Sequence, residues 1–316
     1  MSGVARAVGL LAGYAADRAL GDPRRGHPVA AFGTVAGGLE QRIWADSRAS
    51  GALHCVALVG AATALGAAGG RAVRGRPAGE AAVVALATWT VLGGTSLERE
   101  ARTIGAWLVA GDLDAARARL PHLVGRDPSA LDADGVARAV VESVAENTSD
   151  AVVAPLVWGA LAGAPGLLAY RAANTLDAMV GHRTPRHERF GWASARLDDL
   201  LNLPGARLAG LLAVAAGPDH AGARRAWRRD AASHPSPNAG VVEAAYAGAL
   251  GLRLGGETAY PHRVEQRPVL GDGRAPVPAD VERAVRLARR VQLGSVLVAA
   301  AVALVLPRRA GTAAGT

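Results

Sequence analysis

The residues best suited to chemistry lie in the segment VESVAENTSD. Glu142, Glu146 and Asp150 follow one another at intervals of four, with Asn147 beside them. On a helix this spacing places the side chains on one face. Like charges so arranged repel one another unless a cation lies between them. Carboxylate oxygens suit Mg²⁺, which takes one or two of them and completes its shell with water and phosphate oxygens.

A second interpretation of this segment is helix capping. Asn147, Thr148, Ser149 and Asp150 precede an apolar run, and side chains of these types often cap the first turn of a helix. Capping does not account for Glu142 and Glu146, because both lie before the cap position. We therefore favour metal or phosphate chemistry.

Two further clusters repeat the combination of acid, amide and arginine. They lie in RAANTLDAMVGHR and SARLDDLLNLPGAR. Their members are Arg171, Asn174 and Asp177 in the first, and Arg196, Asp198, Asp199, Asn202 and Arg207 in the second. A site that transfers phosphoryl groups requires carboxylates that bind Mg²⁺. It also requires arginines that donate two hydrogen bonds to phosphate oxygens. We expect the three clusters to meet in one pocket.

Other motifs narrow the class of protein. The chain contains no lysine, which excludes a Walker phosphate loop and a Schiff-base lysine. Cys55 is the only cysteine, so neither a disulfide framework nor a cysteine metal site is available. The histidines lack zinc-site spacing. Despite a net charge of +8, no basic stripe with interleaved aromatics appears, so we expect no nucleic-acid partner.

Three apolar runs must position these clusters. Residues 51–70, 81–97 and 291–306 carry almost no charge over nearly the roughly 20 residues that cross a bilayer. The mean hydropathy of the whole chain is only +0.17, which fits a few spans joined by large polar connections. The alternative is a soluble all-α protein with buried helices. We favour the membrane.

Two shorter apolar segments are ambiguous. Residues 151–170 are interrupted by five Pro and Gly residues, so they form either a straight span or a broken, re-entrant pair of half-helices. We favour the broken pair. Residues 208–217 are either a buried helix or a half-span extended by LLNLPGA. The segment from 262 to 280 is a polar connection rich in Pro and Gly, and no strand pattern of any length is visible. The fold class that we predict is all-α: a polytopic integral membrane protein with broken or re-entrant helices and large polar connections.

These motifs resemble a known series. GDPRRGHPV, VGRD, ESVAENTSDAVVAPL, YRAANTLDAMVGHR, FGWASARLDDLLNLPGARL and SPNAGVVEAAYAGALGLRLGG occur in this order between about residues 14 and 270. The series is similar to that of the adenosylcobinamide-phosphate synthase family of cobalamin biosynthesis. The resemblance implies a multi-pass membrane protein, with residues 1–316 forming a single membrane-embedded synthase domain. It also implies joining of adenosylcobyric acid, through a propionate, to aminopropanol or its phosphate, with ATP and Mg²⁺.

The roles of individual residues follow from their types. We expect the catalytic acids to be Glu142, Glu146, Asp150, Asp198 and Asp199, with Glu146, Asp150 and Asp199 as metal ligands. We expect substrates to be bound by Asn147, Asn174, Asp177, Asn202, Asn238, Arg126, Arg171, Arg196 and Arg207. Because ATP is cytosolic, the active face of this cell-membrane protein should be cytoplasmic.

Three rival functions remain open on the residues alone. A transporter would also use broken helices and intramembrane acids, yet the three long apolar runs contain no Asp or Glu. A membrane prenyltransferase would use paired Asp-rich motifs with Mg²⁺, usually denser than NTLD and LDDLLN. A structural subunit gives no reason for so many acids beside arginines.

Overall fold

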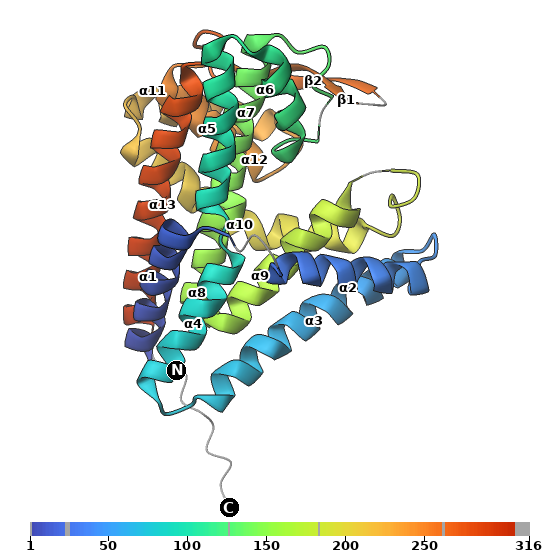
Figure 1. The fold of residues 1–316 in the computed structure, drawn as a ribbon, viewed down its shortest axis with the longest axis vertical. Coiled ribbons are helices and arrows are strands. Elements are labelled where there is room, and N and C mark those ends of the chain that lie inside the picture. Colours follow the sequence, from blue (N-terminus) through green and yellow to red (C-terminus); the bar gives the residue numbers. More distant parts are fainter. Residues whose placement is uncertain (1, 23–25, 126, 183, 261–262, 307–316) are drawn as a thin grey trace, which may run out of the picture. The chain divides into compact units, whose positions relative to one another are not determined.

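The computed structural model describes residues 2–22, 26–125, 127–182, 184–260 and 263–306, and most of them are helical (Figure 1). The predicted all-α class is confirmed. The chain divides into two compact units. Unit 1 comprises Met1–Leu92, Pro155–Ala195 and Val296–Thr316, and unit 2 comprises Gly93–Ala154 and Arg196–Ser295. Both units are discontinuous in sequence, so neither is a separate segment of chain. The single synthase domain stays a prediction.

Unit 1 is built from long helices packed through small residues. Its complete helices are α1 (Gly3–Leu20), α2 (Pro28–Ile43), α3 (Arg48–Ala72), α4 (Pro77–Val91) and α9 (Ala164–Leu176). α1 packs on α4 (Figure 1), where a Cβ added at Gly9 would lie 2.6 Å from Cβ of Val84. α3 packs on α9, where Gly66 approaches the backbone of Pro165. Small residues at these crossings let the backbones approach closely, as in other membrane helices.

The interrupted apolar segment forms the broken pair that its glycines and prolines predict. α8 (Ala154–Ala162) ends at Gly163, which has φ +66°, and α9 begins with Pro165 in its first turn. Only glycine adopts this left-handed backbone at little cost. A Cβ at Gly166 would lie 2.3 Å from the carbonyl oxygen of Trp158, so the two helices contact each other directly beside the break.

Unit 2 contains shorter helices around a dense apolar core. Its complete elements are α5 (Gly94–Ala110), α6 (Leu113–Arg119), α7 (Ala133–Thr148), α11 (His220–Asp230), α12 (Ala239–Leu250), and the strands β1 (Leu254–Tyr260) and β2 (Arg263–Leu270). The core joins Ile104 of α5, Val140 of α7 and Tyr246 of α12, all fully buried. The buried residues of α5 lie mainly on one side of that helix, whereas every residue of α12 is buried, so α12 lies inside the core.

The strands correct one expectation. The segment from 262 to 280, expected to be a polar connection, contains β2, which pairs in an antiparallel hairpin with β1 just before that segment; a bulge lies between Leu254 and Gly256. Pro268 and the two glycines at 255 and 256 disfavour strands in general, so they conceal the hairpin in the sequence. Gly255 and Gly256 have φ +79° and +83° and make the bulge possible.

Among the described residues, four helical stretches are long and apolar enough to cross a membrane. They are Arg48–Ala72, Pro77–Ala110, Trp192–Ala216 and Asp280–Val305. Three coincide with the predicted apolar runs. The third in chain order is α10 (Trp192–Ala216), a helix of 25 residues. It joins LLNLPGA to the ambiguous run at 208–217, as the second of the two predicted alternatives requires. The last is α13 (Asp280–Val305).

Candidate functional site

The first acid cluster lies on α7 and on the π-helical segment Ser149–Val153 that continues it. A π turn contains one more residue than an α turn, and here the N–H of Ala154 bonds to the carbonyl of Ser149, so the turn shifts the register of the residues that follow it. The helix does not restart at Ser149. The alternative interpretation that Ser149 and Asp150 cap a following helix is therefore wrong.

Asp150 and Asn202 connect the first cluster to the third. The amide of Asn202 donates to Oδ1 of Asp150, and the Ser149 hydroxyl donates to Oδ1 of Asn202 over 3.4 Å. Asn202 is 2% exposed, so this link is shielded from water. Gly205, one turn further along α10, lets the two backbones meet, because a Cβ there would lie 2.3 Å from Cβ of Ala154.

Two further acids of α10 lie one turn before Asn202. Asp198 is buried and is placed four residues from Asn202 on the same helix. Asp199 is half-buried, and its carboxylate lies 3.8 Å from the exposed guanidinium of Arg196. The predicted catalytic acids of this cluster therefore border the contact between Asp150 and Asn202.

Arg207 and Asn238 form a clamp between α10 and the start of α12. Arg207 donates to Oδ1 of Asn238 over 2.8 Å and to the carbonyl of Pro237 over 2.9 Å. The Asn238 amide donates to the backbone carbonyl of Asp199 over 2.8 Å. Asn238 does stand at the predicted helix start, yet its side chain does not cap α12. Both residues hold the backbone around Asp199, and their predicted contacts with substrate stay a prediction.

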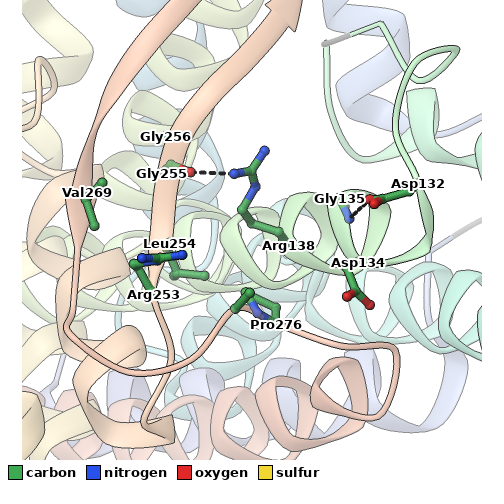
Figure 2. Close-up of a pocket in the computed structure, with 11 residues that line it drawn as sticks. Asp132, Asp134, Gly135, Arg138, Arg253, Leu254, Gly255, Gly256, Val269 and Pro276 are labelled. Atoms are coloured by element: carbon green, nitrogen blue, oxygen red, sulfur yellow. Dashed lines mark hydrogen bonds between the residues drawn. The ribbon is translucent and has the colours of Figure 1, made fainter.

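Glu142 binds a backbone group of the hairpin. Its Oε1 accepts from the N–H of Gly255 over 2.8 Å, and Arg138, one turn earlier on α7, donates to the carbonyl of Gly255 over 2.7 Å (Figure 2). Glu142 is only 3% exposed. A carboxylate and a guanidinium four residues apart thus hold both ends of the bulged residue. Sequence reasoning missed Arg138, although its spacing of four from Glu142 is visible in the chain.

Glu146 and Asn147 complete the last turn of α7. Both are half-buried, and the Asn147 amide donates to the carbonyl and the hydroxyl of Ser143 over 3.0 and 3.1 Å. The described geometry gives Asn147 a local partner on its own helix. Its predicted contact with substrate stays a prediction.

A buried histidine lies near the acid face of α7. His234 precedes α12, and its Nε2 lies 3.9 Å from Oε1 of Glu243, with both side chains almost fully buried. Burial lowers the pKa of His234, and the positive charge of Arg267 lowers it further. The hydrogen bond with the backbone of Ser236 and the negative charge of Glu142 act in the opposite direction. The histidine is therefore neutral at pH 7. In the sequence His234 begins the Pro-rich turn HPSPNAG, a motif that does not indicate a buried imidazole.

The second cluster belongs to unit 1. Arg171 donates to Oδ1 of Asn174 over 3.4 Å on α9. Asp177 begins a second π-helical segment, Asp177–Gly181, and a Cβ at Gly181 would lie 1.8 Å from Oδ1 of Asp177. Glycine at 181 thus leaves room for the carboxylate. The meeting of this cluster with the other two stays a prediction, and Arg126 lies outside the described residues.

The oxygen donors of unit 2 fit the chemistry of Mg²⁺. Searched over the part of the chain that the structure describes, no group of three or more His, Cys, Asp or Glu side chains is placed to hold a metal ion. Mg²⁺ does not require such a group, since it commonly binds through one or two carboxylates and substrate phosphate. Asp150, linked to Asn202, supplies a suitable carboxylate. The predicted set of Glu146, Asp150 and Asp199 remains a prediction.

Comparison with known proteins shows the family. The sequence model of the family described as "CobD/Cbib protein" matches residues 10–288. The chain is 56% identical to the cobalamin biosynthesis protein CobD of Mycobacterium tuberculosis, over 96% of this chain and 97% of that protein. It is 45% identical to proteins of the same name from Rhodobacter capsulatus, over 91% and 94% of the two chains, and Geobacter metallireducens, over 92% and 94%.

No solved structure matches this chain. The family match covers α7, the Asp150–Asn202 link and the hairpin, and the identity to the Mycobacterium tuberculosis protein extends over nearly the whole length. The protein therefore belongs to the CobD/Cbib family, whose members named above are cobalamin biosynthesis proteins.

Proposed function

We propose that this protein is an ATP-dependent amide synthase, adenosylcobinamide-phosphate synthase. It would join a propionate of adenosylcobyric acid to (R)-1-aminopropan-2-ol O-phosphate, or to free aminopropanol. Membership of a family of cobalamin biosynthesis proteins supports the corrinoid substrate. The single structural observation that carries the proposal is the link between Asp150 and Asn202, which joins two predicted acid clusters in unit 2.

The reaction explains why acids and arginines lie together. A carboxylate and an ammonium do not condense in water, so the carboxylate first takes the γ-phosphoryl group of ATP and ADP leaves. The amine then loses a proton to a base and attacks the acyl phosphate, which releases inorganic phosphate and forms the amide. Mg²⁺, when bound, supplies charge neutralisation for the triphosphate.

The chain's own residues would perform the remaining tasks. Asp150 and Asp199 would hold Mg²⁺, which would supply the positive charge that binds the phosphate groups, and Glu146 would accept the proton of the ammonium. Arg196, the cation paired with Asp199, binds phosphate oxygens. Asn202 orients Asp150 through the buried amide bond. The cytoplasmic face of the cell membrane is the proposed location, because ATP is available there.

Mass spectrometry of the reaction product tests this proposal. We expect the purified protein to form the amide from adenosylcobyric acid, the amine, ATP and Mg²⁺. Glu146→Gln and Asp199→Asn should each abolish turnover while leaving insertion and folding intact. Asp114→Asn is the matched control, since Asp114 is fully exposed on α6. Full activity in both site variants would refute the assignment of residues, and absence of amide with the unmodified protein would refute the function.

A further inference from the structure

A pocket of about 370 Å³ lies between the start of α7 and the hairpin (Figure 2). Its charged and backbone lining includes Asp132, Asp134, Arg138, Arg253, Gly255 and Gly256. The pocket is in unit 2 and contains none of the predicted catalytic, substrate-binding or metal-binding residues, although Arg253 and the residues up to Gly256 end the last of the quoted motifs. It is far too small for a corrin ring and of a size suited to a small metabolite.

Two arginines line this pocket from different elements. Arg138 comes from α7, and Arg253 comes from the segment just before β1. Arg138 is held in place by its bond to the carbonyl of Gly255, whose N–H is in turn held by the buried Glu142. A guanidinium has five N–H donors in a planar fork that matches phosphate oxygens. The pair is therefore suited to a phosphate group.

The acids at the opposite side limit the size of the anion. Asp132 accepts from the N–H of Gly135 over 2.8 Å and so caps α7, while Asp134 lies in the electrostatic field of Arg274. A second phosphate group would extend toward these carboxylates and be repelled. The charge pattern favours a single phosphate over the polyphosphate chain of a nucleotide.

The face of α7 continues from this pocket to the acid cluster. Arg138, Glu142 and Glu146 follow at intervals of four, so the cation and the acids lie on one face. Side chains one turn apart have Cβ atoms about 5–6 Å from each other. A phosphate and an ammonium joined by a two-carbon spacer lie about 4–5 Å apart, given ordinary bond lengths. Such a ligand would place its phosphate on the arginines and its ammonium toward Glu142.

We propose that this pocket is a preformed binding site for a small phosphomonoester carrying an amine, with its phosphate on Arg138 and Arg253. The assignment rests on the proposed function, in which such a compound is the amine co-substrate. It adds to that function the location of the amine, the groups that recognise its phosphate, and a direction in which its nitrogen points along α7.

Calorimetric titration of the full-length protein in detergent tests the site without turnover. The probes are 1-aminopropan-2-ol O-phosphate, the free amine and inorganic phosphate, in the absence of ATP and corrinoid. The test variant is Arg253→Gln, because Arg253 is exposed and its side chain does not hold the hairpin. Arg253→Lys keeps the charge, and Arg224→Gln makes the same change of charge on an exposed face of α11.

Arg253→Gln should raise the Kd of the phosphorylated amine at least tenfold and change that of the free amine less than twofold. The Kd of Arg253→Lys for the phosphorylated amine should lie between those of the unmodified protein and Arg253→Gln. Arg224→Gln should bind with the Kd of the unmodified protein. The proposal is overturned if the unmodified protein does not bind the phosphorylated amine, or if Arg253→Gln and Arg224→Gln weaken it equally. Amide formation is measured separately. If the protein binds the phosphorylated amine but forms no amide, the proposed function is refuted and the binding site stands. If the protein forms the amide but Arg253→Gln leaves the Kd unchanged, the binding site is refuted and the proposed function stands.

Discussion

Buried polar side chains are used differently in the two units. In unit 1 they bind mainly to the backbone: Glu80 accepts from the N–H groups of Ser2 and Gly75 over 2.9 and 3.2 Å, and Arg6 donates to the carbonyl of Leu161 over 3.0 Å. Bonds of this kind fix helix ends and loops. Unit 1 does contain side-chain pairs, such as Glu40 with Arg186, but these are partly exposed.

In unit 2, by contrast, several polar side chains also bind one another, in addition to backbone contacts such as that of Glu142 with Gly255. Asn202 binds Asp150, Arg207 binds Asn238, and Arg289 binds the buried Glu98 over 2.6 Å. Bonds between two side chains are the minority in folded proteins, and where they are satisfied they fix the positions of both side chains. The difference teaches that a polar residue in unit 1 should matter for stability, and a polar residue in unit 2 for activity as well.

The largest expected effect is that of Asn202→Asp. It places a second carboxylate against Asp150 in a site shielded from water and removes the amide donor of Asn202. The repulsion and the lost hydrogen bond should lower the free energy of unfolding by roughly 3 kcal/mol. The swapped double variant, Asp150→Asn with Asn202→Asp, restores one amide facing one carboxylate. We expect it to recover most of the lost stability, measured by thermal unfolding in detergent.

The control for that experiment is the double-mutant cycle itself. If the two substitutions add, with no recovery in the double variant, the contact between Asp150 and Asn202 does not stabilise the protein. Turnover of the double variant is a second measurement. We expect turnover to stay low even where stability returns, because the carboxylate has moved to another helix.

The sequence predicts the elements better than their contacts. Uncharged runs reveal the spans because a bilayer imposes a length and a composition on any helix that crosses it. Gly163 and Pro165 reveal the break between α8 and α9, because both residues interrupt helices. The hairpin of β1 and β2 is not visible, since Pro268 and the glycine pair at 255 and 256 resemble a loop.

The candidate site is predictable only in part, for a related reason. The spacing of Glu142, Glu146 and Asp150 predicts a common face, and it assumes regular α-helix throughout. The π-helical segment Ser149–Val153 interrupts that regular helix, and the residue types do not predict it. The link from Asp150 to Asn202 spans 52 positions and depends on the close approach at Gly205. Contacts of that kind arise from tertiary packing.

An intermediate effect, on stability alone, is expected for Glu80→Gln in unit 1. The change removes the charge and replaces one acceptor oxygen by an amide that faces a backbone N–H. Leaving such a donor unsatisfied costs about 1–3 kcal/mol. Thermal unfolding should reveal this loss, while turnover per folded molecule stays unchanged. Glu188→Gln, the same change at an exposed position of unit 1, is the control. Loss of turnover without loss of stability would contradict the contrast between the units.

The smallest effect is a pH dependence that His234 gives to unit 2. Burial lowers the pKa of His234 in the folded protein, with Glu243, Glu142 and Arg267 as its charged neighbours. The unfolded chain therefore binds more protons than the folded one between that lowered pKa and the ordinary value of about 6.5. The free energy of unfolding should therefore rise with pH through this window and level off above it. Acidification through the same window should lower it.

His234→Asn removes the titrating group and keeps an acceptor for the N–H of Ser236, which His234 Nδ1 now accepts over 3.1 Å. We expect the slope of stability against pH from 5.5 to 7 to flatten in this variant. His122→Asn, at an exposed position of unit 2, should retain the slope. Identical slopes in both variants would mean that burial of His234 imposes no cost of protonation, and that the polar contacts around α12 are open to water.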